Sequence, residues 1–200
     1  MEVAMTEHGT QGSELVGRIE LIEKMIADGR RTTWRWGWAF VLWGAGHLAA
    51  LGWTALAPDQ QNLAWGVTMM GCGVATAVLA TVLRRGQPRT QPARGVAAIW
   101  NAFVVSLFVL IALAPGAGLS REALVALILL LLGGANVASG LMLDLRLQLA
   151  VGAGWFVTSL VVARAPTAAG QAAFAAAALL FEVAFGLWLM AQERAGGARA

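Results

Sequence analysis

Charge, cysteine and tyrosine are all scarce in this sequence. Of its 200 residues 12% are charged, one is cysteine and none is tyrosine. A soluble domain carries about 25% charged residues, so this chain lacks the polar groups that would cover a globule in water. The single cysteine, Cys72, excludes an internal disulfide framework. No redox or metal-ligand motif surrounds it, so we interpret Cys72 as a small packing residue within the membrane, near the middle of its segment.

Apolar residues take the place of the missing charge. They make up 58% of the chain, and the mean hydropathy is +0.69. A helix needs roughly 20 apolar residues to cross a hydrocarbon layer of about 30 Å. The segments of about this length are Trp36–Leu56, Leu63–Leu83, Val96–Ala114, Glu122–Leu143, Leu147–Ala163 and Gln171–Ala191. Because almost no charge interrupts them, they predict an all-α, polytopic membrane protein with six transmembrane helices rather than a soluble helical protein.

The polar ends divide the chain into a leader, a bundle and a tail. Residues 1–35 form the cytoplasmic leader, residues 36–191 the transmembrane bundle, and residues 192–200 the cytoplasmic tail. The leader has no early apolar core of the kind found in a secretory signal peptide. We therefore expect the first spanning helix to act as the insertion signal and to remain in the protein.

Basic residues alternate between crowded and sparse positions along the chain. If both termini are cytoplasmic, 12 of the 14 Lys and Arg residues lie inside and 2, Arg121 and Arg164, lie outside. The positive-inside rule selects this topology, and we expect it in the inner membrane of a bacterium. The cytoplasmic rim, which includes Arg84 and Arg85, is expected to contact anionic lipid headgroups of the bilayer. No nucleic-acid partner is expected, because these basic residues lack a surrounding soluble fold.

The leader contains a stretch with helical periodicity. Apolar residues separated by three or four positions lie on one helical face: Leu15, Ile19, Ile22 and Ile26. This spacing predicts an amphipathic helix over Ser13–Arg31. Either the helix lies on the inner leaflet with its apolar face down, or this face docks a partner protein or a second copy. In both cases we expect Arg30 and Arg31 to belong to the contact surface.

The even-numbered segments share an internal pattern in which Val-Ala recurs in register, followed by small residues. The pattern predicts three helical hairpins, each entering and leaving on the cytoplasmic side. The small residues Gly73, Ala77, Gly140 and Gly186 would let helix backbones approach closely. This architecture resembles the HdeD-like group of bacterial membrane proteins, which are six-helix chains built from hairpins with glycine-rich even helices. The resemblance covers roughly residues 36–191 and excludes the leader. It implies a stress-linked membrane protein without established chemistry or catalytic residues.

Few polar side chains fall deep inside the apolar segments. His47 and Glu182 lie near the middle of theirs, and Asn136 and Asn101 lie in the inner halves. Such groups are costly in a membrane and therefore need partners or a function. Glu182 is either a hydrogen-bonded structural carboxyl or a proton or cation site, and His47 is either a neutral structural ring or part of that site. Because their depths are similar, we hypothesise that His47 and Glu182 pair across the bundle.

Sequence motifs for catalysis are missing. There is no zinc-type histidine pair, nucleophile elbow, phosphate loop or dinucleotide fingerprint, so no metal or cofactor is expected. Our leading hypothesis is a non-enzymatic accessory or sensor-type protein that engages a partner or the lipid surface through its leader helix and basic rim. The small residues also suggest a homo-oligomer. The alternative is a small transporter or channel with a proton- or cation-linked path at Glu182, His47 and Asn136. An intramembrane enzyme is disfavoured.

Overall fold

The computed structural model describes residues 16–21, 35–83, 91–165 and 167–197. Over these ranges the regular structure is helical, and no strand occurs in them. Six helices are long and apolar enough to cross a membrane, which confirms an all-α chain with six candidate spans and fits a multi-pass membrane protein. The elements are α2 (Gly37–Leu56), η1 (Pro58–Gln60), α3 (Gln61–Leu83), α4 (Gln91–Leu113), α5 (Arg121–Met142), α6 (Arg146–Arg164), α7 (Thr167–Ala177), η2 (Ala178–Ala184) and α8 (Phe185–Gly197).

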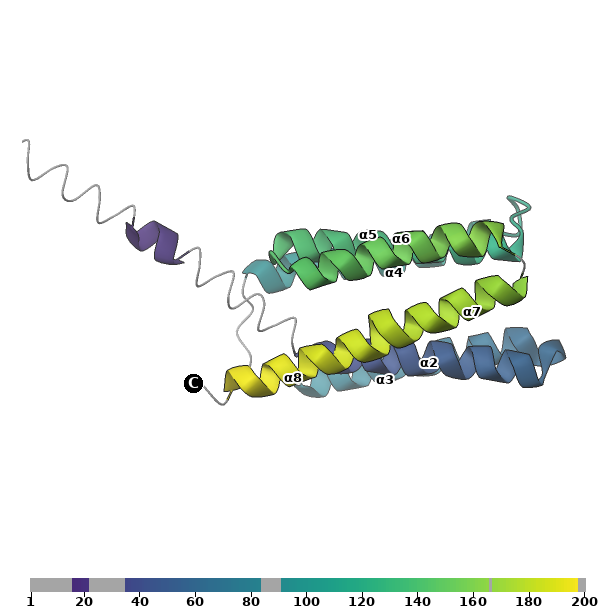
Figure 1. Cartoon of the computed structure of the whole chain (residues 1–200), viewed down its shortest axis with the longest axis horizontal. Helices are drawn as coiled ribbons and strands as arrows, with labels where there is room; N and C mark the ends of the chain where they lie inside the picture. The colour runs from purple at the N-terminus through teal and green to yellow at the C-terminus, as the bar shows by residue number, and fades with distance from the viewer. Residues whose placement is uncertain (1–15, 22–34, 84–90, 166, 198–200) are drawn as a thin grey trace, which may run out of the picture.

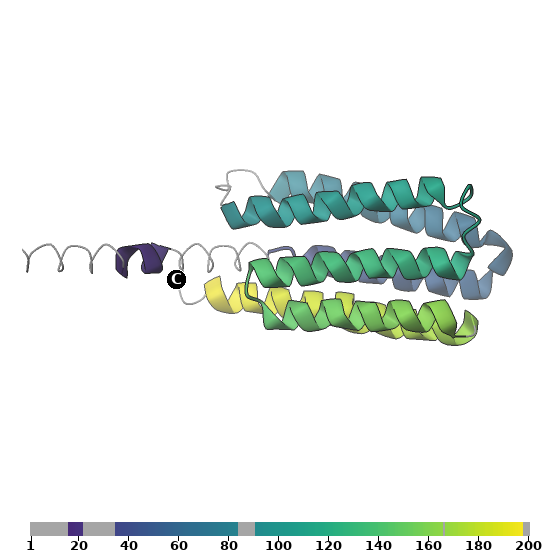
Figure 2. The same ribbon diagram turned by 90° about the horizontal axis from the view of Figure 1, so that it is seen from above.

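The spanning helices form two layers of three (Figure 1). One layer holds α4, α5 and α6, with α5 in the middle; the other holds α3, α2 and the continuous helix α7–η2–α8, with α2 in the middle (Figure 2). Within the layers α5 packs on both α4 and α6, and α2 packs on both α3 and α8. The last helix runs obliquely, so that α7 contacts α6 in the other layer while η2 and α8 contact α2.

Glycines allow the closest helix crossings. A Cβ added to Gly37 would lie 2.6 Å from the carbonyl oxygen of Gly186, and a Cβ on Gly186 would lie 2.6 Å from that of Gly37. Between α5 and α6, a Cβ on Gly140 would lie 3.0 Å from the amide nitrogen of Leu149. Close backbone packing, expected for Gly140 and Gly186, is therefore present at both. Small residues at such crossings let backbones come within van der Waals contact, which is the main attraction between helices in lipid.

The same expectation is wrong for α3. A Cβ on Gly73 would meet no atom within 4 Å, and Ala77 is exposed. The buried residues of α3 are instead Ala64 and Cys72, because α3 packs on α2 through a different face. Cys72 itself packs against Gly46, where an added Cβ would collide with the Cys72 sulfur. The prediction that Cys72 is a packing residue is thus confirmed.

Large apolar side chains fill the space between the layers. Leu129, Trp155 and Leu189 are almost inaccessible, and they belong to one cluster with Phe174 and Phe185. Helix α4 takes little part in this core, since none of its residues is buried. Since α3 and α4 occupy the same edge of both layers (Figure 2), this edge presents mainly hydrocarbon side chains to its surroundings.

The last spanning helix is interrupted by a π-helical segment, Ala178–Ala184. π-helices are rare and occur mostly as single turns inserted into α-helices, frequently at functional sites. Glu182 lies within this segment and is buried. The interruption therefore changes the backbone geometry at the one acidic residue that sequence reasoning placed deep in the membrane.

Candidate functional site

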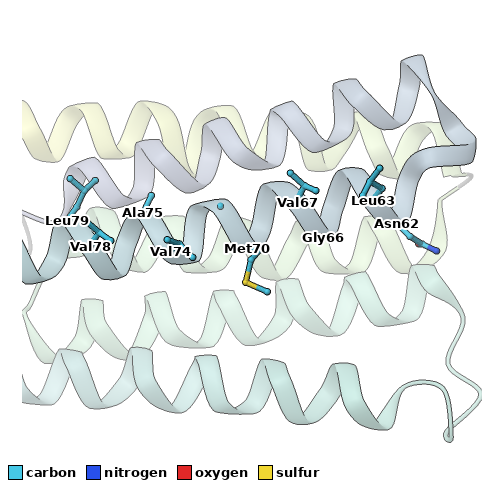
Figure 3. A pocket seen from close by; sticks show the side chains of 10 residues that line it. Asn62, Leu63, Gly66, Val67, Met70, Val74, Ala75, Val78 and Leu79 are labelled. Carbon is cyan, nitrogen blue, oxygen red and sulfur yellow. The ribbon is translucent and has the colours of Figure 1, made fainter.

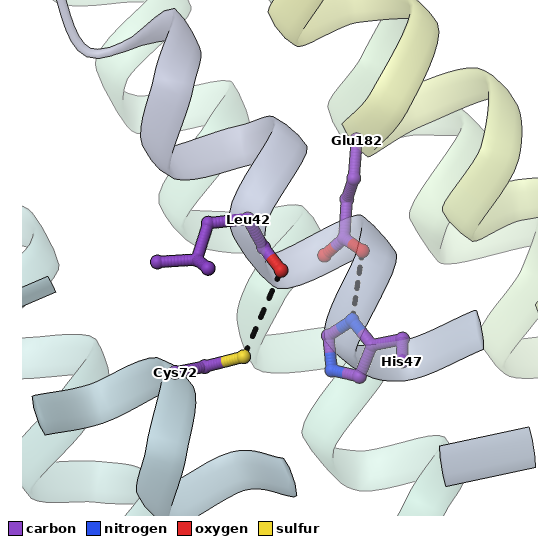
Figure 4. A network of polar contacts seen from close by, with 4 residues as sticks. All are labelled: Leu42, His47, Cys72 and Glu182. Atoms are coloured by element: carbon purple, nitrogen blue, oxygen red, sulfur yellow. Dashed lines mark hydrogen bonds and ion pairs between the residues drawn. The ribbon is translucent and has the colours of Figure 1, made fainter. Parts of the chain in front are cut away.

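His47 of α2 and Glu182 of η2 form a hydrogen-bonded pair inside the bundle. The distance from His47 Nδ1 to Glu182 Oε2 is 2.7 Å, and the two side chains are 13% and 5% exposed (Figure 4). The contact hypothesised from their similar depth is therefore present. It joins residues 135 positions apart in the chain, so only the packing of α2 against the last helix creates it.

Gly44 makes this approach possible. A Cβ on Gly44 would lie 2.8 Å from the Cβ of Glu182 and 2.7 Å from Cγ2 of Val183. Gly44 stands three residues before His47, so both lie on the face of α2 that meets η2. The absence of a side chain at Gly44 brings the two backbones close enough for the imidazole to reach the carboxyl group.

The pair can hold a proton in alternative places. When one proton lies between His47 Nδ1 and Glu182 Oε2, there are two arrangements: Nδ1–H donates to the carboxylate, or the carboxyl O–H donates to Nδ1. A pair with an imidazolium and a carboxylate, or with a neutral ring and a neutral carboxyl, has no net charge. Loss of one proton leaves a net negative charge, which is costly in a low-dielectric interior. The pair is therefore uncharged overall when it holds this proton and anionic when it does not.

Aromatic rings surround the histidine. The His47 ring centroid lies 5.3 Å from that of Phe174 and 6.1 Å from those of Trp43 and Trp65. Trp43 in turn donates through Nε1 to the hydroxyl of Thr76 at 3.1 Å, which ties α2 to α3. These rings surround the imidazole with aromatic surface, and its side-chain hydrogen bond within the described residues is the one to Glu182.

Asn136 does not join the pair. It is fully buried in α5, and its Nδ2 donates to the carbonyl oxygen of Leu132 at 2.9 Å. Its Oδ1 has no hydrogen-bond partner among the described residues, and the same holds for Ser139 Oγ and Gln148 Oε1. Sequence reasoning did not single out Ser139 or Gln148. The only available signal was a polar residue at an otherwise apolar position, and nothing in the sequence shows that Gln148 of α6 is almost completely buried.

Asn101 has a different environment from Asn136. It is an exposed residue of α4, and its side chain makes no hydrogen bond to any residue that the structure describes. The remaining predicted contact residues belong to the leader and the basic rim. Residues 16–21 are helical and Ile19 is 57% exposed. The other predicted contact residues lie outside the described residues: Leu15, Ile22, Ile26, Arg30, Arg31, Arg84 and Arg85.

Grooves and metal-type clusters do not coincide with the histidine–glutamate pair. The described residues contain no group of three or more His, Cys, Asp or Glu side chains placed to hold a metal ion. One open groove runs along α3 from Asn62 to Leu79 past Gly66 and Met70 (Figure 3). Its lining is almost entirely apolar, which suits acyl chains. The second groove lies between α4 and α5, and neither groove includes His47 or Glu182.

No protein-family model, curated protein or solved structure matches this chain. The resemblance to HdeD-like proteins stays a prediction.

Proposed function

We propose that this chain is a non-enzymatic, sensor-type protein of a bacterial inner membrane, and that its input is the protonation state of the His47–Glu182 pair. The observation that carries the proposal is the 2.7 Å bond between an imidazole and a carboxyl group inside the spanning bundle. Buried ionisable groups at membrane depth mark functional sites by default, since a purely structural bond can be made without a titratable group.

A change in protonation of the His47–Glu182 pair can alter the packing of the two helical elements that carry it, α2 and η2. Deprotonation places a net negative charge between α2 and η2, so the two elements separate or rotate until water or another donor reaches the carboxylate. At the end of α2 where the leader joins, Arg35 lies 3.8 Å from Glu193 of α8, and both side chains are about half exposed. Such an exposed ion pair contributes little, so the contact that holds this end of the crossing is the close packing of Gly37 against Gly186.

The leader is the element we propose to carry the output. It precedes α2 in the chain, so we infer that a shift of α2 is passed on to the leader. With both termini cytoplasmic, as the distribution of arginines favours, the apolar face of Ser13–Arg31 and the basic rim engage a partner or the inner leaflet. Deletion of residues 13–31 should leave the bundle inserted and abolish partner recovery in a pull-down from mild detergent. Unchanged recovery would remove the leader from the proposal.

Infrared difference spectroscopy tests the input directly. The full chain is reconstituted in lipid vesicles, and spectra are recorded across a pH series. We expect a carboxyl or carboxylate band that changes with pH in the wild type, is missing in Glu182→Gln, and shifts in His47→Gln. Glu193→Gln is the matched control, because that carboxylate lies on the same helix but is about half exposed; it should leave the band unchanged. A band that survives in Glu182→Gln would refute a titrating pair.

A proton-linked transporter is the second candidate, because the same pair suits a proton carrier. Asn136, the third expected member of that path, bonds within its own helix rather than to the pair. Vesicles loaded with a pH-sensitive dye separate the two functions. Proton flux that is present in the wild type and lost in Glu182→Gln supports transport, whereas a titrating carboxyl without flux supports the sensor.

A further inference from the structure

Helix α4 exposes a stripe of residues that follows the spacing of a helix–helix seam. The exposed residues at alternating intervals of four and three are Arg94, Ala98, Asn101, Val105, Phe108 and Ala112. We call these six residues the α4 seam. This 3.5-residue repeat is the one that keeps a single face of a helix turned toward a second helix along its whole length. Val105 and Phe108 are 62% and 66% exposed, so the described part of the chain leaves this face uncovered.

Asn101 distinguishes the seam from an ordinary lipid-facing surface. It lies seven residues beyond Arg94, which is roughly 10 Å along the helix axis. If the Arg94 side chain reaches the interface, the Asn101 amide lies within the hydrocarbon. Lipid tails offer no hydrogen bond to an amide, and polar side chains in spanning helices therefore bond to neighbouring helices. The groove on α3 has no polar side chain between its ends, so lipid acyl chains can cover it without leaving a hydrogen-bonding group unpaired.

We propose that the α4 seam is the contact between two copies of this chain. Every copy inserts with the same orientation, because the charge asymmetry that orients it belongs to the sequence. A two-fold axis along the membrane normal then sets α4 of one copy parallel to α4 of the other and places identical residues at identical depth. Asn101 therefore meets Asn101 of the second copy.

The chemistry of the seam fits a copy of itself. An asparagine amide has both an acceptor oxygen and donor hydrogens, so two facing Asn101 side chains satisfy one another. Ala98 and Ala112 let the backbones approach, and the larger Val105 and Phe108 fill the space between them. A single polar residue in an apolar seam also fixes the register of the two helices and the number of helices that associate. The dimer is independent of whether the His47–Glu182 pair senses protons.

Cysteine cross-linking in native membranes tests this arrangement. In a Cys72→Ala background, the single changes Ala98→Cys and Val105→Cys report on the seam. Ser106→Cys is the control, because Ser106 is exposed on α4 but lies about 100° around the helix from Val105, away from the seam. Oxidation should give disulfide-linked dimers from positions 98 and 105 and few from 106. Equal yields at the three positions, or no cross-linking at any, would overturn the seam.

The role of the amide is tested separately from that of packing. Asn101→Leu should weaken dimerisation about tenfold, as loss of an interhelical bond between spanning helices does, whereas Asn101→Gln should retain most of it. The readouts are cross-linking yield from Val105→Cys and the oligomeric state of the full chain in lipid nanodiscs. Ser106→Ala serves as the matched polar deletion and should remain dimeric. A monomeric wild-type chain, or a dimer indifferent to Asn101→Leu, would refute the proposal.

Discussion

Replacing Gly44 by alanine should separate α2 from the π segment and break the histidine–glutamate bond. The new Cβ would lie 2.7 Å from Cγ2 of Val183 and 2.8 Å from Cβ of Glu182. Carbon atoms in contact lie about 3.5–4.0 Å apart, so the helices must move by roughly 0.7 Å. An equal displacement would take the 2.7 Å contact between His47 and Glu182 to about 3.4 Å, near the limit of a hydrogen bond.

The cost of this change follows from overpacking and from the lost bond. Overpacking in a tight interior destabilises by about 1–3 kcal/mol, and a bond between spanning helices adds about 0.6–2 kcal/mol. We expect Gly44→Ala to lower the stability of the reconstituted protein, measured by denaturation with sodium dodecyl sulfate, by about 2–4 kcal/mol. It should also shift the titrating carboxyl band.

Gly52→Ala is the matched control for Gly44→Ala. Both glycines lie in α2, but a Cβ on Gly52 would meet no atom within 4 Å. The control should therefore be neutral or slightly stabilising, because alanine favours the helix. If Gly44→Ala unfolds with the same profile as Gly52→Ala and keeps the carboxyl band in place, the close approach at Gly44 does not position the pair.

Two further substitutions probe the packing of α5 against α6 and of the core. Ser159→Ala removes a 2.7 Å hydrogen bond from Ser159 Oγ to the carbonyl oxygen of Ala126; it should cost about 0.6–2 kcal/mol in the same denaturation assay. Thr158→Ala should cost less, because Thr158 bonds only to Gly154 of its own helix, and equal losses would show that the interhelical bond contributes nothing. Trp155→Ala empties a fully buried position and should cost about 3–5 kcal/mol, whereas Val157→Ala, at a residue 61% exposed, should change stability by less than about 0.5 kcal/mol. Similar effects of these two changes would contradict the placement of Trp155 at the centre of the bundle.

The spanning helices could be predicted from the sequence because the requirement for crossing hydrocarbon applies to each segment separately. Each segment must be long enough and apolar enough by itself, so length and composition alone identified six spans. The same reasoning located His47 and Glu182 by depth, since position along a spanning helix converts directly into distance from the membrane surface. Their contact at 2.7 Å then required only that the two helices be neighbours.

Helix neighbours, by contrast, could not be read from composition. Lipid tails are as apolar as leucine, so burial against lipid and burial against another helix leave the same pattern in the sequence. Ala77 and Gly186 occupied equivalent positions in the internal pattern, yet Ala77 is exposed whereas a Cβ on Gly186 would meet the backbone of α2. The burial of Gln148, the exposure of Asn101 and the π turn at Glu182 also depend on which helix lies alongside.

The sequence by itself determined which segments enter the bilayer, because the transfer free energy of a helix is a sum over its own residues. Only the tertiary structure decided which side chains meet. Lateral contact depends on the shapes of two surfaces taken together: a glycine such as Gly44 acts only through the atoms of Glu182 and Val183 that occupy the space it leaves.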